Sequence, residues 1–115
     1  MNYKVSTVDA LKELEKKNKL RFIEVMKHGS MTIEFFKPKN VDTQTLHKQD
    51  EIYVIIKGDS IFFRDDERVN CKGGDILFVP AGMNHRFENF SEDFETWVIF
   101  YGPDGGEKEK TAPIN

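Results

Sequence analysis

The sequence predicts a small all-β sandwich or barrel that is preceded by one short α-helix. From Leu20 to Tyr101, short apolar and β-branched runs alternate with clusters of Gly, Pro, Asn, Asp and Ser, the pattern of strands joined by turns. Before Lys19 the apolar residues instead recur three apart among Lys and Glu, which is typical of an amphipathic helix. Eight or nine short strands after a single helix indicate a closed or two-layered β fold.

The helix is expected over residues 7–18. Its apolar residues are Val8, Leu11 and Leu14. Ser6 or Thr7 is a suitable N-cap, Asp9 is favourable in the first turn, and Asn18 is a suitable stop. We expect this helix to pack across the outside of the barrel, with a lid or a dimer arm as the alternatives.

The nine predicted strands cover residues 20–27, 31–37, 41–47, 51–57, 61–64, 69–71, 76–79, 84–89 and 94–101. Two segments with a central or leading glycine, 28–30 and 58–60, are predicted to be tight hairpins. The acidic segment 65–67 lacks the spacing of a calcium loop and is predicted to be a solvated turn. Cys71 is expected to be an ordinary strand residue.

Composition narrows the function classes. The formal net charge of −3 argues against binding to nucleic acid or to an anionic membrane surface, which both depend on Lys and Arg. No apolar run has the length of a signal peptide or a membrane span, so we expect a cytoplasmic protein. With Cys71 as the single cysteine, no intrachain disulfide is possible. A nucleophilic serine elbow and a phosphate-binding glycine loop are both absent from the sequence.

Two histidines and a glutamate, His47, Glu51 and His85, are the candidate metal ligands. Imidazole nitrogen and carboxylate oxygen together suit a divalent first-row metal. Four residues of straight strand would separate His47 from Glu51 by about 13 Å, so the chain has to turn between them. Each residue alone is more simply explained by packing or exposure, but their joint spacing favours a metal site.

Two segments resemble the two sequence motifs of the cupin superfamily. The second motif is Gly, five residues, Pro-x-Gly, two residues, His, three residues and Asn. This chain matches every fixed position of it, with Gly74, Pro80, Gly82, His85 and Asn89. The first motif is matched by His47, Glu51 and Gly58. It departs at Thr45, which stands where the first histidine belongs, and at Lys39, which replaces the leading glycine.

The resemblance, which covers about residues 20–102, implies a cupin-like jelly-roll β-barrel, often a homodimer, with a metal near the barrel axis. We therefore divide the chain into a helical segment (1–19), a cupin barrel domain (20–103) and a flexible tail (104–115). The resemblance also implies that His47, Glu51 and His85 bind iron, manganese, nickel or zinc. Because Thr45 is not an imidazole, an empty or partly filled site is the alternative, and Gln44 and Gln49 are spare oxygen donors.

The alternation of side chains places Tyr53, Ile55 and Phe87 on the metal-facing side, and Arg86 outward. Trp97, Ile99 and Tyr101 share one face of the last strand and are expected to extend the same wall. Such a cavity, aromatic and with few convergent charges, suits a small, partly apolar ligand. Three function classes stay open: a metalloenzyme of oxygenase, isomerase or lyase type, with Tyr53 as candidate proton donor; a metal-containing binding module; and a metal-free structural barrel.

Overall fold

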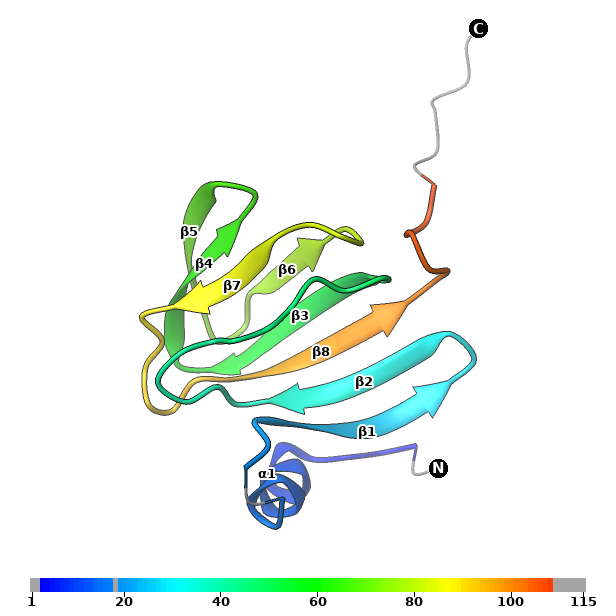
Figure 1. Ribbon diagram of the computed structural model, residues 1–115. Helices are drawn as coiled ribbons and strands as arrows, with labels where there is room; N and C mark the ends of the chain where they lie inside the picture. Colours follow the sequence, from blue (N-terminus) through cyan, green and yellow to red (C-terminus); the bar gives the residue numbers. More distant parts are fainter. Residues whose placement is uncertain (1–2, 18, 109–115) are drawn as a thin grey trace, which may run out of the picture.

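The computed structural model describes residues 3–17 and 19–108. One helix, α1 (Thr7–Glu15), precedes eight strands: β1 (Phe22–His28), β2 (Met31–Phe36), β3 (Asp50–Lys57), β4 (Asp59–Arg64), β5 (Glu67–Lys72), β6 (Ile76–Val79), β7 (His85–Glu88) and β8 (Glu95–Tyr101). The strands form a five-stranded sheet in the order β1-β2-β8-β3-β6 and a three-stranded sheet in the order β5-β4-β7. All neighbouring strands are antiparallel. Figure 1 shows the two sheets and α1, and the predicted all-β fold with one short helix is confirmed.

Helix α1 begins at Thr7 as expected, and the Ser6 side chain caps it by accepting a hydrogen bond of 3.1 Å from the backbone N–H of Asp9. It ends at Glu15, earlier than the sequence suggested, while the proposed stop at Asn18 lies outside the described residues. The buried side chains of Ala10 and Leu14 pack against Phe35 on the outer face of the larger sheet, as expected. Within the described residues, no helix has the length and apolarity that a membrane span requires.

The strand predicted over residues 41–47 is not present, and that prediction is wrong. Its residues form an irregular segment whose one bridge joins Val41 to Lys39. The reason is local: the carboxylate of Asp42 accepts hydrogen bonds from the backbone N–H groups of Gln44 and Phe87, at 3.0 and 2.8 Å. A side chain that bonds to the backbone in this way replaces the strand ladder that a polar segment would otherwise form.

Of the two hairpins predicted at glycines, one is confirmed and one is wrong. β1 and β2 pair directly around Gly29, with His28 opposite Met31. In contrast, β3 pairs with β6 and β8, whereas β4 pairs with β5 and β7. Gly58 is therefore a corner at which the chain leaves one sheet for the other. Its φ is +81°, a conformation that favours glycine, and a Cβ there would lie 2.6 Å from the Cα of Phe94. Both the backbone conformation and the lack of space therefore require glycine.

The interior between the sheets is largely aromatic. The Tyr53 ring lies 4.9 Å from that of Phe87 and 5.7 Å from that of Phe62, and all three are almost fully buried. Ile55 is 2% exposed in the same cluster, so the predicted inward face of β3 is confirmed.

The inward face of β8 is the opposite of the predicted one. Val98 and Phe100 belong to the buried cluster and pair with Tyr53 and Glu51, respectively. Trp97 instead packs edge-on against Phe35, at 5.6 Å, beneath α1. Because the helix covers the outer face, β8 is apolar on both sides, and its sequence does not distinguish them.

The segment that was expected to be a loose tail begins close to the barrel. The backbone N–H of Gly105 donates to the carbonyl of Lys48, at 2.7 Å, and that of Glu107 donates to Asp50 Oδ2, at 2.8 Å. Residues 105–107 are therefore held beside the start of β3, and residues 109–115 lie outside the described part of the chain.

The corner at Gly58 gives a first prediction. Gly58→Ala is expected to lower the free energy of unfolding by about 2–4 kcal/mol, because it adds both a strained φ and a clash with the Phe94 backbone. Gly29→Ala is the control, since its φ is +58° but a Cβ there would meet no atom within 4 Å, and it should cost about 1 kcal/mol. Urea unfolding measures both, and equal losses would contradict the close contact.

Candidate metal site

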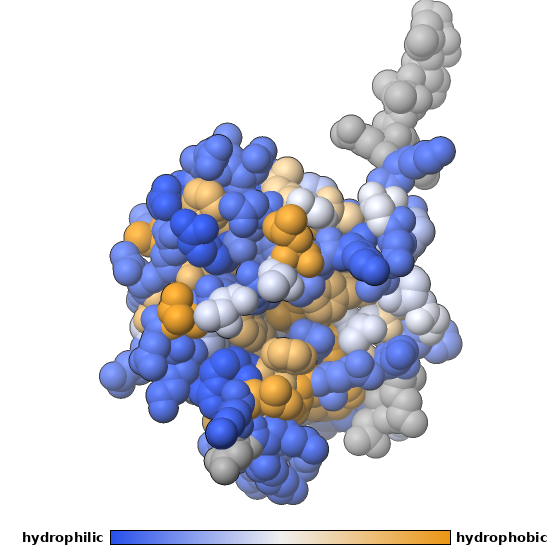
Figure 2. Space-filling model, viewed as in Figure 1, coloured by the Kyte–Doolittle hydropathy of each residue, from blue (hydrophilic) through white to orange (hydrophobic). Residues whose placement is uncertain are grey.

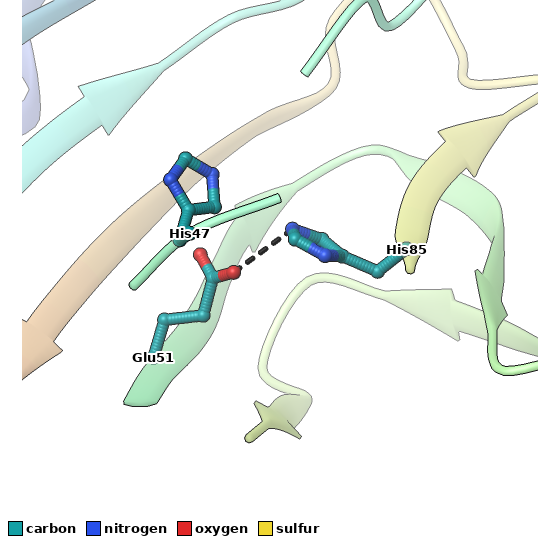
Figure 3. A group of neighbouring side chains, drawn as sticks. All are labelled: His47, Glu51 and His85. Carbon is teal, nitrogen blue, oxygen red and sulfur yellow. Dashed lines mark ion pairs between the residues drawn. The ribbon is translucent and has the colours of Figure 1, made fainter. Parts of the chain in front are cut away.

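The three predicted ligands converge inside the barrel (Figure 3). Glu51 lies on β3, His85 begins β7, and His47 belongs to the irregular segment that leads into β3. Residues 48–49 bend, as the distance argument required. One ligand atom from each side chain lies within 4.8 Å of the others, and His85 Nε2 is 2.9 Å from Glu51 Oε1. Within the residues that the structure describes, these side chains lie close enough together that they could hold one metal ion.

Several polar atoms of this group are buried without a hydrogen-bond partner. Glu51 is only 1% exposed, and among the described residues neither of its carboxylate oxygens has a partner of hydrogen-bond geometry, although His85 Nε2 lies 2.9 Å from Oε1. His47 Nε2 is also buried and has no hydrogen-bond partner within the same ranges. Burying such groups costs free energy unless a hydrogen bond or a cation compensates. Two imidazoles and a carboxylate are donors that suit a divalent transition metal, so the residues fit such an ion.

The ring of His85 is held in the orientation that a ligand needs. Its Nδ1 lies 2.9 Å from the carbonyl oxygen of Met83, which can only accept a hydrogen bond. We therefore assign the proton of the neutral ring to Nδ1. The unprotonated Nε2 faces Glu51 and is the atom that can bind a metal ion. A backbone carbonyl that fixes the tautomer of a histidine is a common outer-shell partner in metal sites.

The surroundings shift the pKa values at this site in different directions. Burial lowers the pKa of His47 and outweighs the opposing charge of Glu51. Burial also acts to lower the pKa of His85, but the contact with Glu51 and the hydrogen bond to Met83 outweigh it, and the net shift is upward. Burial raises the pKa of Tyr53 well above its usual value, so this phenol keeps its proton.

Tyr53 lies at the edge of the same group. Its hydroxyl is 3.1 Å from His85 Nε2 and donates a hydrogen bond of 2.9 Å to Gln44 Oε1. Gln44, expected to be a spare metal donor, thus orients a phenol. Gln49, the other spare donor, directs its amide nitrogen to the carbonyls of Ser30 and Gly102.

Asp42 is a supporting residue that sequence reasoning missed. It is 6% exposed and accepts three hydrogen bonds, from the backbone and side-chain amides of Gln44 and from the backbone of Phe87. It thereby ties the irregular segment to β7, next to His85. In the sequence, the sign of this role is that Asp42 stands two residues before Gln44, a spacing at which an Asp side chain can accept a hydrogen bond from the backbone. This spacing is common in turns and does not specify a role.

A cavity of about 700 Å³ opens beside the site and reaches from His47 and Phe100 to β1 and β2. Thr45 is exposed and lines it. Apolar surface lies in the middle and lower part of the face in Figure 2, surrounded by hydrophilic residues. The cavity was expected to have few charges, but Glu24 and Glu34 also line it.

Arg86, predicted to point outward, stacks over Phe63 and pairs with Glu88.

Comparison with known proteins agrees with the fold and with the two motifs. The family model described as the Cupin domain matches residues 32–100, which is more than half of the chain. The chain belongs to the cupin family, and the resemblance inferred from the motifs is confirmed.

The relatives vary in how much of their own length the chain spans. An uncharacterized protein of Streptomyces coelicolor is 26% identical over 103 residues, which are 88% of this chain and 98% of that protein. Acireductone dioxygenase of Drosophila pseudoobscura pseudoobscura is 38% identical over 63 residues, 50% of this chain and 34% of the enzyme. The oxalate-binding protein of Thermotoga maritima is 38% identical over 47 residues, 38% of this chain and 39% of that protein. The chain thus spans less than half of the length of both the dioxygenase and the oxalate-binding protein.

Solved structures support the fold alone. A protein from Photorhabdus luminescens superposes with a TM-score of 0.65 and 17% identity, covering 89% of both chains. A cupin superfamily protein from Desulfitobacterium hafniense gives a TM-score of 0.60 and 20% identity, covering 72% of this chain and 77% of the other.

The role of Asp42 gives the second prediction. Asp42→Asn should lower the free energy of unfolding by about 1–3 kcal/mol. The NH2 group of the new amide would face N–H groups whose hydrogen bonds the carboxylate accepts in the wild type. The control is Asp59→Asn, an exposed residue whose side chain makes no hydrogen bond with the described residues. Chemical unfolding compares the two, and an unchanged stability of Asp42→Asn would show that the segment is held by other contacts.

Proposed function

We propose that this chain is a metal-binding cupin that acts on or binds a small, partly apolar molecule. His47, Glu51 and His85 hold one divalent transition metal ion, of iron, manganese, nickel or zinc. The observation that carries the proposal is the Glu51 carboxylate. It is 1% exposed, lies close to two imidazoles, and has no partner of hydrogen-bond geometry in the part of the chain that the structure describes. Two histidines and one carboxylate leave coordination positions open for a ligand.

The residues around the three metal ligands have different roles. The Met83 carbonyl holds the His85 ring, and Asp42 holds Gln44, which in turn orients the Tyr53 hydroxyl. Tyr53 keeps its proton, which it donates to Gln44 Oε1, and its hydroxyl oxygen lies 3.1 Å from His85 Nε2. It is the candidate to donate that proton to a bound ligand. When bound, the metal supplies a Lewis acid for an oxygen of that ligand. An oxygenase, isomerase or lyase reaction is consistent with this set.

The relatives support the small-molecule part of the proposal. The named matches are acireductone dioxygenases and an oxalate-binding protein, and both names refer to small, oxygen-rich organic molecules. The second candidate function is binding without turnover. It is favoured by Thr45, which supplies no imidazole where the first histidine of the first motif belongs. A metal-free structural barrel is the remaining class, and metal analysis separates it from the other two.

The metal is the third prediction. The purified protein, dialysed against zinc and then against buffer, should retain about one equivalent of zinc per chain. His85→Ala should weaken zinc binding by more than about 100-fold, because loss of an outer-shell partner alone costs about 10–100-fold. His28→Ala, at the exposed β1–β2 turn, is the matched control and should bind as the wild type does. Elemental analysis gives the stoichiometry, and a wild type without bound metal would refute the proposal.

Turnover is the fourth prediction. Oxygen uptake by the iron-loaded protein is measured against small diketones, phenolics and organic acids. Tyr53→Phe should keep its iron and lose about 100-fold or more in kcat, because it removes a positioned proton donor. Tyr101→Phe, at the end of β8, is the control. Unchanged kcat in Tyr53→Phe would exclude the proton-donor role, and saturable binding without uptake in the wild type would favour the binding module.

A further inference from the structure

Glu34 faces the same interior as the candidate metal ligands. On the larger sheet it lies opposite Val98 of β8, and Val98 lies opposite Tyr53 of β3. Directly opposed residues of antiparallel strands share a face, so these three form one row across the inner side. Strands lie about 4.8 Å apart, which puts the Glu34 and Tyr53 backbones about 10 Å from each other. Glu34 therefore lies on the wall of the cavity, two strands away from β3, the strand that contains Glu51.

The carboxyl group of Glu34 has no partner of its own. It is half-buried, and no hydrogen bond or ion pair joins it to any other residue of the ranges 3–17 and 19–108. The residue directly opposite on β1 is Glu24, another acid that lines the cavity. A half-buried acid beside a like charge is unfavourable unless it is protonated or meets a ligand that donates to it.

The electrostatic surroundings of Glu34 agree with this placement. Burial, together with the charges of Glu24 and Glu51, raises its pKa to about 7. The group is therefore mostly protonated at pH 6 and mostly ionised at pH 8. Besides Glu24 and His47, the charged residues that line the cavity are Lys19, Arg21, Asp42, Lys48 and Asp104.

The cavity has two polar regions. At one end it is lined by His47, whose buried Nε2 has no hydrogen-bond partner among the described residues and which lies beside the 1% exposed Glu51. At the other, Glu34 presents an acid on β2. Phe36 and Phe100 are among the residues that line the cavity as well. A molecule that satisfies both ends has a metal-binding head, a short apolar middle and a tail that donates hydrogen bonds.

We propose that Glu34 selects the ligand of this cavity by the charge of its tail. It favours a small molecule whose end remote from the metal-binding head is a protonated amine, and it rejects one whose remote end is a carboxylate. This inference rests on the proposed function, because the head of the ligand is held at the metal.

Two catechols test this selection, because they share one metal-binding head. Dopamine ends in an ammonium group, and 3,4-dihydroxyphenylpropionate ends in a carboxylate. Each is titrated by calorimetry, at pH 6 and pH 8, into the zinc-loaded wild type, Glu34→Gln and Glu67→Gln. Glu67 is an exposed acid on β5 and serves as the matched control. Both ligands bind the metal through the same catechol group, so the pH dependence of that binding cancels in the ratio of their two dissociation constants.

The wild type should bind dopamine at least about tenfold more tightly than the acid at pH 8, where Glu34 is ionised. The preference should shrink at pH 6, as Glu34 takes up a proton. Glu34→Gln, which keeps the shape of the side chain, should retain zinc but lose the preference at both pH values. Glu67→Gln should behave as the wild type does.

The failures of the two proposals can be told apart. If zinc does not bind to the wild type, the proposed function itself is wrong. If zinc binds but the wild type binds neither catechol, binds both equally at pH 8, or keeps its preference in Glu34→Gln, only the selection by Glu34 is overturned.

Discussion

The buried carboxylate of Glu51 is the group on which the rest of this structure depends. A carboxylate that is 1% exposed loses its hydration, and among the described residues its close contact is with His85 Nε2, 2.9 Å from Oε1. Removing charged groups from water costs several kcal/mol unless other charges compensate. Glu51 is held in this position because β3 is paired on both sides, to β6 and β8. The scaffold thus fixes an acid at a buried position where a cation or a protonated imidazole would stabilise it.

The residues around Glu51 come from parts of the chain that the corner at Gly58 and the side chain of Asp42 bring together. Gly58 sends the chain into the second sheet, which supplies β7 and therefore His85. Asp42 joins the segment that contains His47 to the same strand, through the backbone of Phe87. The metal donors and the phenol thereby lie between the two sheets, while α1 packs on the outer face of the larger sheet beside β1 and β2.

Much of this could be predicted from the sequence, because the information was local. The three ligands stand at fixed spacings from turn residues, and the strands follow from short apolar runs bounded by Gly, Pro and Asp. The rest depended on long-range pairing. The inward side of β8 is decided by α1, the role of Asp42 by a backbone group 45 residues away, and the position of Glu34 by its register against Val98. No local pattern carries that information.

The most direct test of the account is the anomalous diffraction of crystals grown with zinc, measured at the zinc absorption edge. A metal site at these residues predicts one strong peak per chain, at about 2.0–2.2 Å from a nitrogen of His47, a nitrogen of His85 and a carboxylate oxygen of Glu51. A peak that engages only surface residues, or no peak in a chain whose three side chains keep the present arrangement, would contradict it.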